Sequence, residues 1–154
     1  MSNLINPHGG ELCDLLVHKD KKRIIRKESI GLNSITLNNR QLCDIEMLLN
    51  GGFSPLQGFL GKSDYESVVE NNRLSNGIVW PIPITLDIPE ELSEKISTGD
   101  RLVLRDHEGV ALAILNITDK WLPDLSKEAE YVFGTIDRSH PAVDYILNRS
   151  NKVY

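Results

Sequence analysis

The chain has 154 residues, a formal net charge of −5, 40% apolar residues and 25% charged residues, which is typical of a globular protein. This length predicts one domain, residues 1–154, that buries a core without a disulfide or a structural metal. The negative charge disfavours nucleic acid as a partner, because affinity for phosphates is largely electrostatic. No apolar run is long enough to span a bilayer, so we expect no membrane partner.

The N-terminus, "MSNLINPHGG", lacks the cationic start and apolar stretch of a secretory signal. Neither Cys13 nor Cys43 belongs to a Cys-x-x-Cys pair, so no zinc ribbon or redox motif is predicted. These features indicate a cytoplasmic protein.

Residues 1–33 are predicted to be irregular, although "ELCDLLV" is compatible with a short helix. His8 precedes two glycines and is a candidate anion contact, with loop packing as the alternative. The basic stretch 19–27 has two interpretations, a solvated loop or edge, and an anion or RNA contact made by Lys21, Lys22 and Arg23.

The clearest helix is predicted after Asn38, which forms a capping box with Gln41 and precedes an apolar face at helical spacing. Cys43 is predicted to be a small buried residue of that helix. Asn50 and two glycines end it, and a bulky loop, "FSPLQGFLG", follows. Ser63 and Glu66 predict the capping box of a second helix.

The second half of the chain mixes strand and helix patterns. Strands are predicted at 80–88, beginning at a sheet edge because of Pro81 and Pro83, and on both sides of the turn "DHEG". Short helices are predicted in "PEELSEKI", "SKEAEYVFG" and "SHPAVDYILN", the last with Pro141 near its start. The pattern predicts an α+β fold with several short helices around a small, bent, mostly antiparallel sheet.

The residues themselves predict no catalytic, cofactor-binding or metal-binding constellation. "GKS" at 61–63 ends like a phosphate-binding loop, but Leu56 stands where that loop requires glycine, and no strand precedes it. The histidines form no His-x-x-His or His-Glu-x-x-His pair. No pair of carboxylates stands out as an acid–base couple.

Four segments in order, "PHGGELCDLL", "RQLCDIEMLLNGGFSPLQGFL", "DYESVVENNRLSNGIVWPIPITLDI" and "HPAVDYIL", resemble the N-terminal domain of ATP sulfurylase, sulfate adenylyltransferase. The resemblance covers nearly the whole chain. It implies a PUA-like pseudo-barrel with a mixed sheet, related to modules that bind RNA. It also implies a parent enzyme that converts ATP and sulfate to adenosine 5′-phosphosulfate and pyrophosphate, with Mg-ATP handled outside this chain.

That family places a Gln-x-Arg-Asn-Pro segment and a His-x-x-His pair in a following catalytic domain, and neither pattern occurs here. We therefore expect a non-catalytic N-terminal domain, inactive alone, whose partner is the catalytic domain of the same enzyme. Candidate interdomain contacts are Asn50, Phe53, Gln57 and Tyr154, and contacts between copies in a homo-oligomer are a further expectation. The alternatives are a free-standing PUA-like RNA-binding module that uses residues 19–27, and a regulatory module that binds sulfate or a nucleotide weakly near His8.

Overall fold

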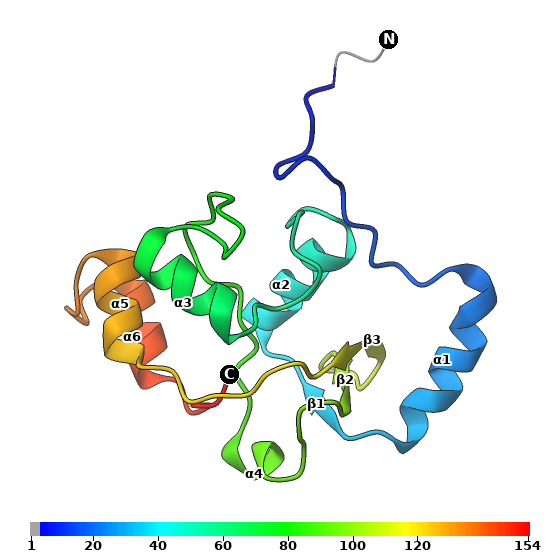
Figure 1. Cartoon of the computed structure of the whole chain (residues 1–154). Coiled ribbons are helices and arrows are strands. Elements are labelled where there is room, and N and C mark those ends of the chain that lie inside the picture. Colours follow the sequence, from blue (N-terminus) through cyan, green and yellow to red (C-terminus); the bar gives the residue numbers. More distant parts are fainter. Residues whose placement is uncertain (1–3) are drawn as a thin grey trace. The chain divides into compact units, whose positions relative to one another are not determined.

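A computed structural model describes residues 4–154 of the chain (Figure 1). The chain divides into two compact units. Unit 1 comprises the residues up to Phe59 together with Asp100–Asn116, and unit 2 comprises Leu60–Gly99 and Ile117–Tyr154. The single domain expected over residues 1–154 stays a prediction.

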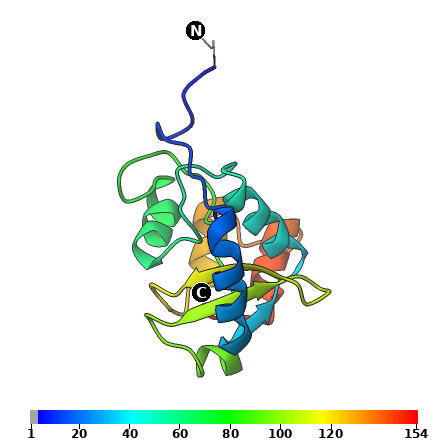
Figure 2. The same ribbon diagram turned by 90° about the vertical axis from the view of Figure 1, so that its right-hand side faces the viewer.

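Unit 1 holds the sheet. Its elements in chain order are the 3-10 helix η1 (Lys19–Lys21), α1 (Lys22–Glu28), η2 (Ser29–Gly31), β1 (Ser34–Thr36), α2 (Asn39–Leu49), β2 (Arg101–Arg105) and β3 (Ala111–Asn116). The strand order is β1-β2-β3, with β1 parallel and β3 antiparallel to β2. Figure 2 shows α1 in front of this sheet. The expected mixed sheet of an α+β fold is confirmed.

The buried apolar residues of unit 1 come largely from β2 and α2. Leu102, Val103 and Leu104 of the central strand are all buried, and Ile45 and Leu48 of α2 are buried as well. The predicted capping box is present, because the Asn38 side chain accepts a hydrogen bond from the Gln41 N–H and the Gln41 side chain accepts one from the Asn38 N–H. Local sequence therefore sets the start of α2, and its apolar face fixes its packing.

Three predictions for unit 1 are wrong. Cys43 is exposed rather than buried, because it lies two residues before Ile45 and so faces away from the buried side of α2. Residues 11–17 form no helix. The Asp14 carboxylate accepts a hydrogen bond from the Leu16 N–H, and the Cys13 N–H donates to the Ser54 hydroxyl. The basic stretch, expected to be a loop or edge within an irregular segment 1–33, instead forms η1 and most of α1, and η2 follows, because this part of the chain is helical.

Unit 2 is helical, with α3 (Lys62–Asn71), α4 (Glu90–Ser93), α5 (Leu125–Phe133) and α6 (Pro141–Asn148). Helices α5 and α6 pack against each other, and α3 packs against α5. Pro141 occupies the first turn of α6 after the N-cap His140, as predicted. Val68, Ala129 and Val143 are fully buried and mark the core of this unit.

Two predictions for unit 2 are also wrong. Residues 80–88 form no regular strand, and only Val79 and Ile88 at its margins make isolated bridges, to Arg73 and Val153. Pro81 and Pro83 have no N–H to give to a ladder. Helix α3 is not capped by Ser63: it begins at Lys62, whose N–H donates to the Asp119 carboxylate at 3.0 Å.

Among the described residues, no helix combines the length and apolar character that crossing a membrane requires.

Candidate interaction surface

The N-terminal arm of unit 1, residues 4–18, is held against the loop that follows α2, residues 50–59. The Cys13 N–H donates to the Ser54 hydroxyl at 2.9 Å, and the Cys13 thiol lies 3.3 Å from the Pro55 carbonyl oxygen. The Ser54 hydroxyl itself donates to the Gly51 carbonyl at 2.6 Å. Gly9 lies so close to Pro55 that an added Cβ would be 2.7 Å from its ring. The arm and the loop therefore form one continuous surface.

The predicted contact residues Asn50, Phe53 and Gln57 lie on this loop. Asn50 is the exposed C-cap of α2, and its side-chain oxygen accepts the Gly52 N–H at 2.8 Å. Phe53 is half-buried and Gln57 is exposed. Gly51 makes the turn with φ +80°, where a Cβ would come within 2.8 Å of the Cys13 carbonyl oxygen. Glycine is therefore required both for the turn and for the close approach of the arm.

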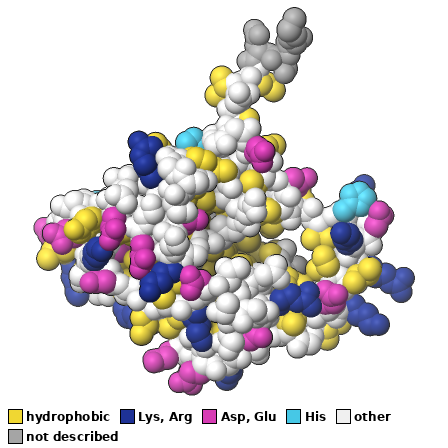
Figure 3. All heavy atoms as spheres, in the orientation of Figure 1, with side chains coloured by type: hydrophobic (Ala, Val, Ile, Leu, Met, Phe, Trp, Pro, Cys, Tyr) yellow, Lys and Arg dark blue, Asp and Glu magenta, His cyan; other side chains and the backbone are white. Residues whose placement is uncertain are grey.

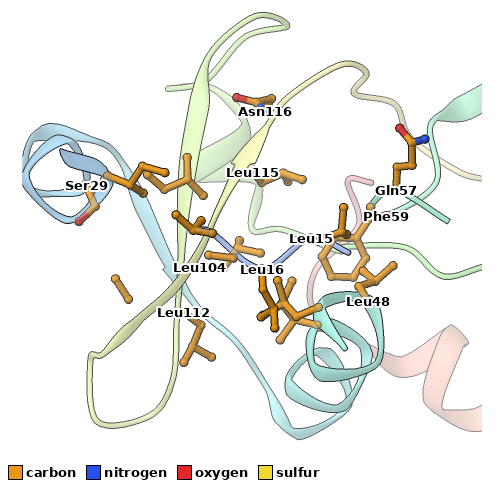
Figure 4. A pocket seen from close by; sticks show the side chains of 18 of the residues that line it. Leu15, Leu16, Ser29, Leu48, Gln57, Phe59, Leu104, Leu112, Leu115 and Asn116 are labelled. Carbon is orange, nitrogen blue, oxygen red and sulfur yellow. The ribbon is translucent and has the colours of Figure 1, made fainter. Parts of the chain in front are cut away.

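A groove with a volume of about 480 Å³ lies within unit 1 (Figure 4). It is lined by residues of the arm, α1, α2, the loop and the hairpin of β2 and β3. Most of its lining is apolar, and the main contributors are Leu15, Leu16, Ile25, Leu48, Phe59, Leu104 and the six residues of β3. Gln57, Ser29 and Asn116 add polar atoms. Figure 3 shows a hollow with apolar side chains beside α1.

The cations of the basic stretch lie on η1 and α1, and all of them are exposed. Figure 3 shows Lys and Arg side chains gathered over α1. Lys22 and Arg26 line the groove, whereas Lys21 and Arg23 do not. The structure therefore brings Lys22 together with Gln57 at one groove. His8 is exposed and belongs to the arm that touches the loop through Gly9.

Tyr154, the fourth predicted contact, lies in unit 2 and is buried. Its hydroxyl donates to Glu128 Oε2 at 2.7 Å, and the Tyr65 hydroxyl donates to the same oxygen at 2.9 Å. Arg149 donates to the Tyr154 hydroxyl and lies over its ring, with Cζ 4.4 Å from the centroid. We call Tyr65, Glu128, Arg149 and Tyr154 the polar cluster. Its geometry makes Tyr154 a structural anchor within unit 2.

The polar cluster is enclosed by aromatic rings and a second acid. The centroids of the Tyr65, Trp121 and Tyr154 rings lie 5.3–5.7 Å apart, in tilted and edge-to-face arrangements. Asp87, 1% exposed, has Oδ1 3.9 Å from Arg149 Nη1. Burial first, and the Glu128 carboxylate second, raise the pKa of both Tyr65 and Tyr154 well above the ordinary tyrosine value. Both hydroxyls therefore stay protonated and act as donors to Glu128.

Sequence reasoning missed Glu128 and Arg149. Glu128 is next to Ala129 and four residues before Val132, which places it on the inward side of α5. That position was a usable signal of a buried acid, although its tyrosine partners lie far away in the sequence. Within residues 4–154, no group of three or more His, Cys, Asp or Glu side chains is arranged to hold a metal ion.

Comparison with known proteins identifies the family. The sequence profile described as "PUA-like domain" matches residues 5–154. Sulfate adenylyltransferase of Eremothecium gossypii is 46% identical over 152 residues, which cover 98% of this chain and 30% of that protein. Sulfate adenylyltransferase of Schizosaccharomyces pombe is 52% identical over 132 residues, or 84% of this chain and 27% of that protein.

Among solved structures, a hexameric APS kinase from Thiobacillus denitrificans is similar, with a TM-score of 0.71 and 38% identity. The match covers 79% of this chain and 24% of that one. The chain thus spans less than a third of the length of the curated relatives it matches. The expected resemblance to sulfate adenylyltransferase is confirmed, and the chain belongs to the PUA-like domain family.

Proposed function

We propose that this chain is the non-catalytic PUA-like domain of a sulfate adenylyltransferase and supports the catalytic domain by packing against it. In the reaction of sulfate adenylyltransferase a sulfate oxygen attacks the α-phosphorus of ATP. Adenosine 5′-phosphosulfate forms and pyrophosphate leaves. Mg-ATP is a substrate that the catalytic domain holds, outside this chain.

The observation that carries the proposal is the partial match: 98% and 84% of this chain align with only 30% and 27% of these two sulfate adenylyltransferases. A domain that works as part of a larger protein is expected to present apolar surface for its neighbour. Leu12 and Leu16 of the arm are 69% and 65% exposed; Leu12 lies beside Gly51 of the loop, and Leu16 lines the same groove as Gln57. This surface is our candidate interdomain contact.

Contacts between copies are a second part of the proposal. The similar structure from Thiobacillus denitrificans is described as hexameric, and its matching segment shares the fold of this chain. A homo-oligomer of the parent enzyme is therefore consistent with the role proposed here.

A chimera tests the proposal. This chain replaces the matching 152-residue segment of the Eremothecium gossypii enzyme, and sulfate-dependent release of pyrophosphate from Mg-ATP is measured. We expect activity within about tenfold of the parent and none above background from the isolated chain. Sulfate-dependent turnover by the isolated chain would contradict the non-catalytic role.

A charge substitution in the chimera tests the contact surface. Gln57→Arg should lower activity or weaken assembly, because an unpaired charge is costly to bury at an interface. Glu94→Arg, at an exposed position outside the loop, serves as the control. Equal effects of the two substitutions would remove the loop from the proposed contact.

The alternative function, RNA binding by residues 19–27, is favoured by one observation: every cation of this stretch is exposed. Filter binding of a structured RNA at two salt concentrations tests it. Micromolar binding that weakens with salt, and that is lost when Lys21, Lys22 and Arg23 become Ala, would support RNA binding. Salt-independent or absent binding would exclude it.

A further inference from the structure

Strand β3 is an open edge of the sheet in unit 1. It pairs with β2 on one side only, and β1 occupies the opposite edge of the sheet. Outside the β2 ladder, no backbone hydrogen bond of Ala111–Asn116 to another described residue is present. None of its six residues is buried. The strand therefore presents unpaired N–H and C=O groups to its surroundings.

This edge lacks two features that usually block strand addition, charge and proline, although the register of the ladder shifts between Leu104 and Arg105, opposite Ala113 and Ala111. The sequence "ALAILN" contains no charged residue and no proline. Natural edge strands commonly carry lysine or proline, which prevent another strand from pairing. The chemistry of β3 therefore permits a further strand.

The groove runs along the same edge. All six residues of β3 line it, although side chains of successive strand residues point to opposite faces. The groove therefore offers both the backbone edge and an apolar recess for alternate side chains of an added strand (Figure 4).

Charge indicates the class of occupant. The charged residues that line the groove are Lys22 and Arg26, and no carboxylate lines it. Neither cation forms an ion pair with another residue of the described part of the chain. The chain as a whole has a charge of −5, so the groove is a local cationic exception. An acidic partner gains favourable charge pairing at this position.

We propose that the groove along β3 binds an extended, acidic segment of another polypeptide, which adds as a strand to β3 and places its apolar side chains in the recess. Its carboxylates face Lys22 and Arg26. This inference goes beyond the proposed enzymatic context and rests on the β3 edge and on Lys22 and Arg26, although Leu16 and Gln57 belong both to the groove and to the candidate interdomain contact.

A labelled peptide tests the proposal on the full chain. The probe is the peptide fluorescein-Glu-Val-Thr-Val-Glu-Val-Thr-Val-Glu. Its binding is measured by fluorescence anisotropy. Two control peptides replace every Glu by Lys or every Thr by Pro, and the second keeps the charge but removes amide donors. We expect the probe to bind at least about tenfold more tightly than either control, a difference of about 1.4 kcal/mol. Equal binding of the three peptides would overturn the proposal.

Matched charge reversals locate the site. Lys22→Glu with Arg26→Glu should weaken probe binding at least about tenfold and improve binding of the Lys peptide. Lys21→Glu with Arg23→Glu makes the same change of charge on cations that do not line the groove, and should have a much smaller effect. Equal loss in both variants, or displacement of the probe by a structured RNA, would indicate diffuse electrostatic binding and overturn the proposal.

Hydrogen exchange distinguishes strand addition from charge attraction. The probe should slow exchange of the outward amides within residues 111–116, because they become hydrogen-bonded to the added strand. Protection confined to α1 would overturn the proposal. Protection that rises with protein concentration in the absence of peptide would instead show pairing of β3 with a second copy, and would also overturn it.

Discussion

Removal of the Glu128 carboxylate should destabilise unit 2 substantially. Glu128 is 4% exposed, and one of its oxygens accepts hydrogen bonds from the Tyr65 and Tyr154 hydroxyls at 2.9 and 2.7 Å. In Glu128→Ala both buried hydroxyls lose their acceptor, at a cost of about 1–3 kcal/mol each. The substitution also removes a buried carboxylate, whose desolvation opposes folding. We therefore expect a net loss of about 3 kcal/mol in the free energy of unfolding.

Glu128→Gln is the matched control, because its amide oxygen still accepts a hydrogen bond while the charge is lost. Hydrogen bonds to charged groups are worth about 1 kcal/mol more than neutral ones, so the expected cost is about 1–2 kcal/mol. Glu128→Ala combined with Tyr65→Phe should cost less than the sum of the single changes by about 1 kcal/mol, since one orphaned hydroxyl is removed.

Urea titration followed by tryptophan fluorescence measures these effects. Both tryptophans, Trp80 and Trp121, belong to unit 2, and the Trp121 ring lies 5.5 Å from the Tyr65 ring. The signal therefore reports the unit that holds the polar cluster. A loss below about 0.5 kcal/mol for Glu128→Ala, or a larger loss for Glu128→Gln, would refute the assignment of Glu128 as the shared acceptor.

Three further predictions follow from the structure. The pKa of Tyr154 is raised in the folded state, so the stabilisation by its hydroxyl is fully present below the ordinary tyrosine pKa of 10.0 and is lost as the pH rises above it. Above pH 10 the free energy of unfolding should therefore fall less steeply with pH in Tyr154→Phe, by about 1.4 kcal/mol per pH unit. Identical slopes in the two proteins would contradict this. Gly51→Ala should lower the free energy of unfolding by at least about 1 kcal/mol more than Gly109→Ala, because both glycines have positive φ but only a Cβ at Gly51 would meet a carbonyl oxygen, that of Cys13. Thermal melts compare the two variants. Equal losses would show that the contact with Cys13 adds no cost. Asn38→Ala should cost about 1 kcal/mol through loss of the α2 cap, measured by urea titration with far-UV circular dichroism, and no change would show that the cap is dispensable.

The sequence predicts elements whose signals are local. Helix α2 was predictable because the capping box of Asn38 and Gln41 and its apolar face all lie within the segment itself. The turn between β2 and β3 was likewise predictable, since the Asp106 side chain accepts the Glu108 and Val110 N–H groups at 3.0 and 2.8 Å. Such elements depend little on the rest of the chain.

Elements that depend on distant partners were predicted poorly. The β-branched residues in 80–88 favour an extended chain, but a ladder also requires a neighbouring strand and amide donors that the two prolines lack. The start of α3 depends on Asp119, 57 residues away from Lys62, and the polar cluster depends on Tyr65, 63 residues from Glu128. Pairings over such separations are set by tertiary packing and leave no local pattern.

The two units use their polar groups differently, and this difference bears on where partners bind. In unit 2 the acid Glu128 is buried and the side chain of the cation Arg149 is 7% exposed, and both use Tyr154 as a hydrogen-bonding partner. Substitutions in this cluster are therefore expected to act through stability. Unit 1 instead leaves the backbone edge of β3 unpaired and holds the cations Lys22 and Arg26 beside an apolar groove. Charge reversal of these exposed cations should change binding while the urea midpoint stays nearly constant, because exposed charges contribute little to folding stability. A reversal that lowered both together would instead make the groove a structural feature of unit 1.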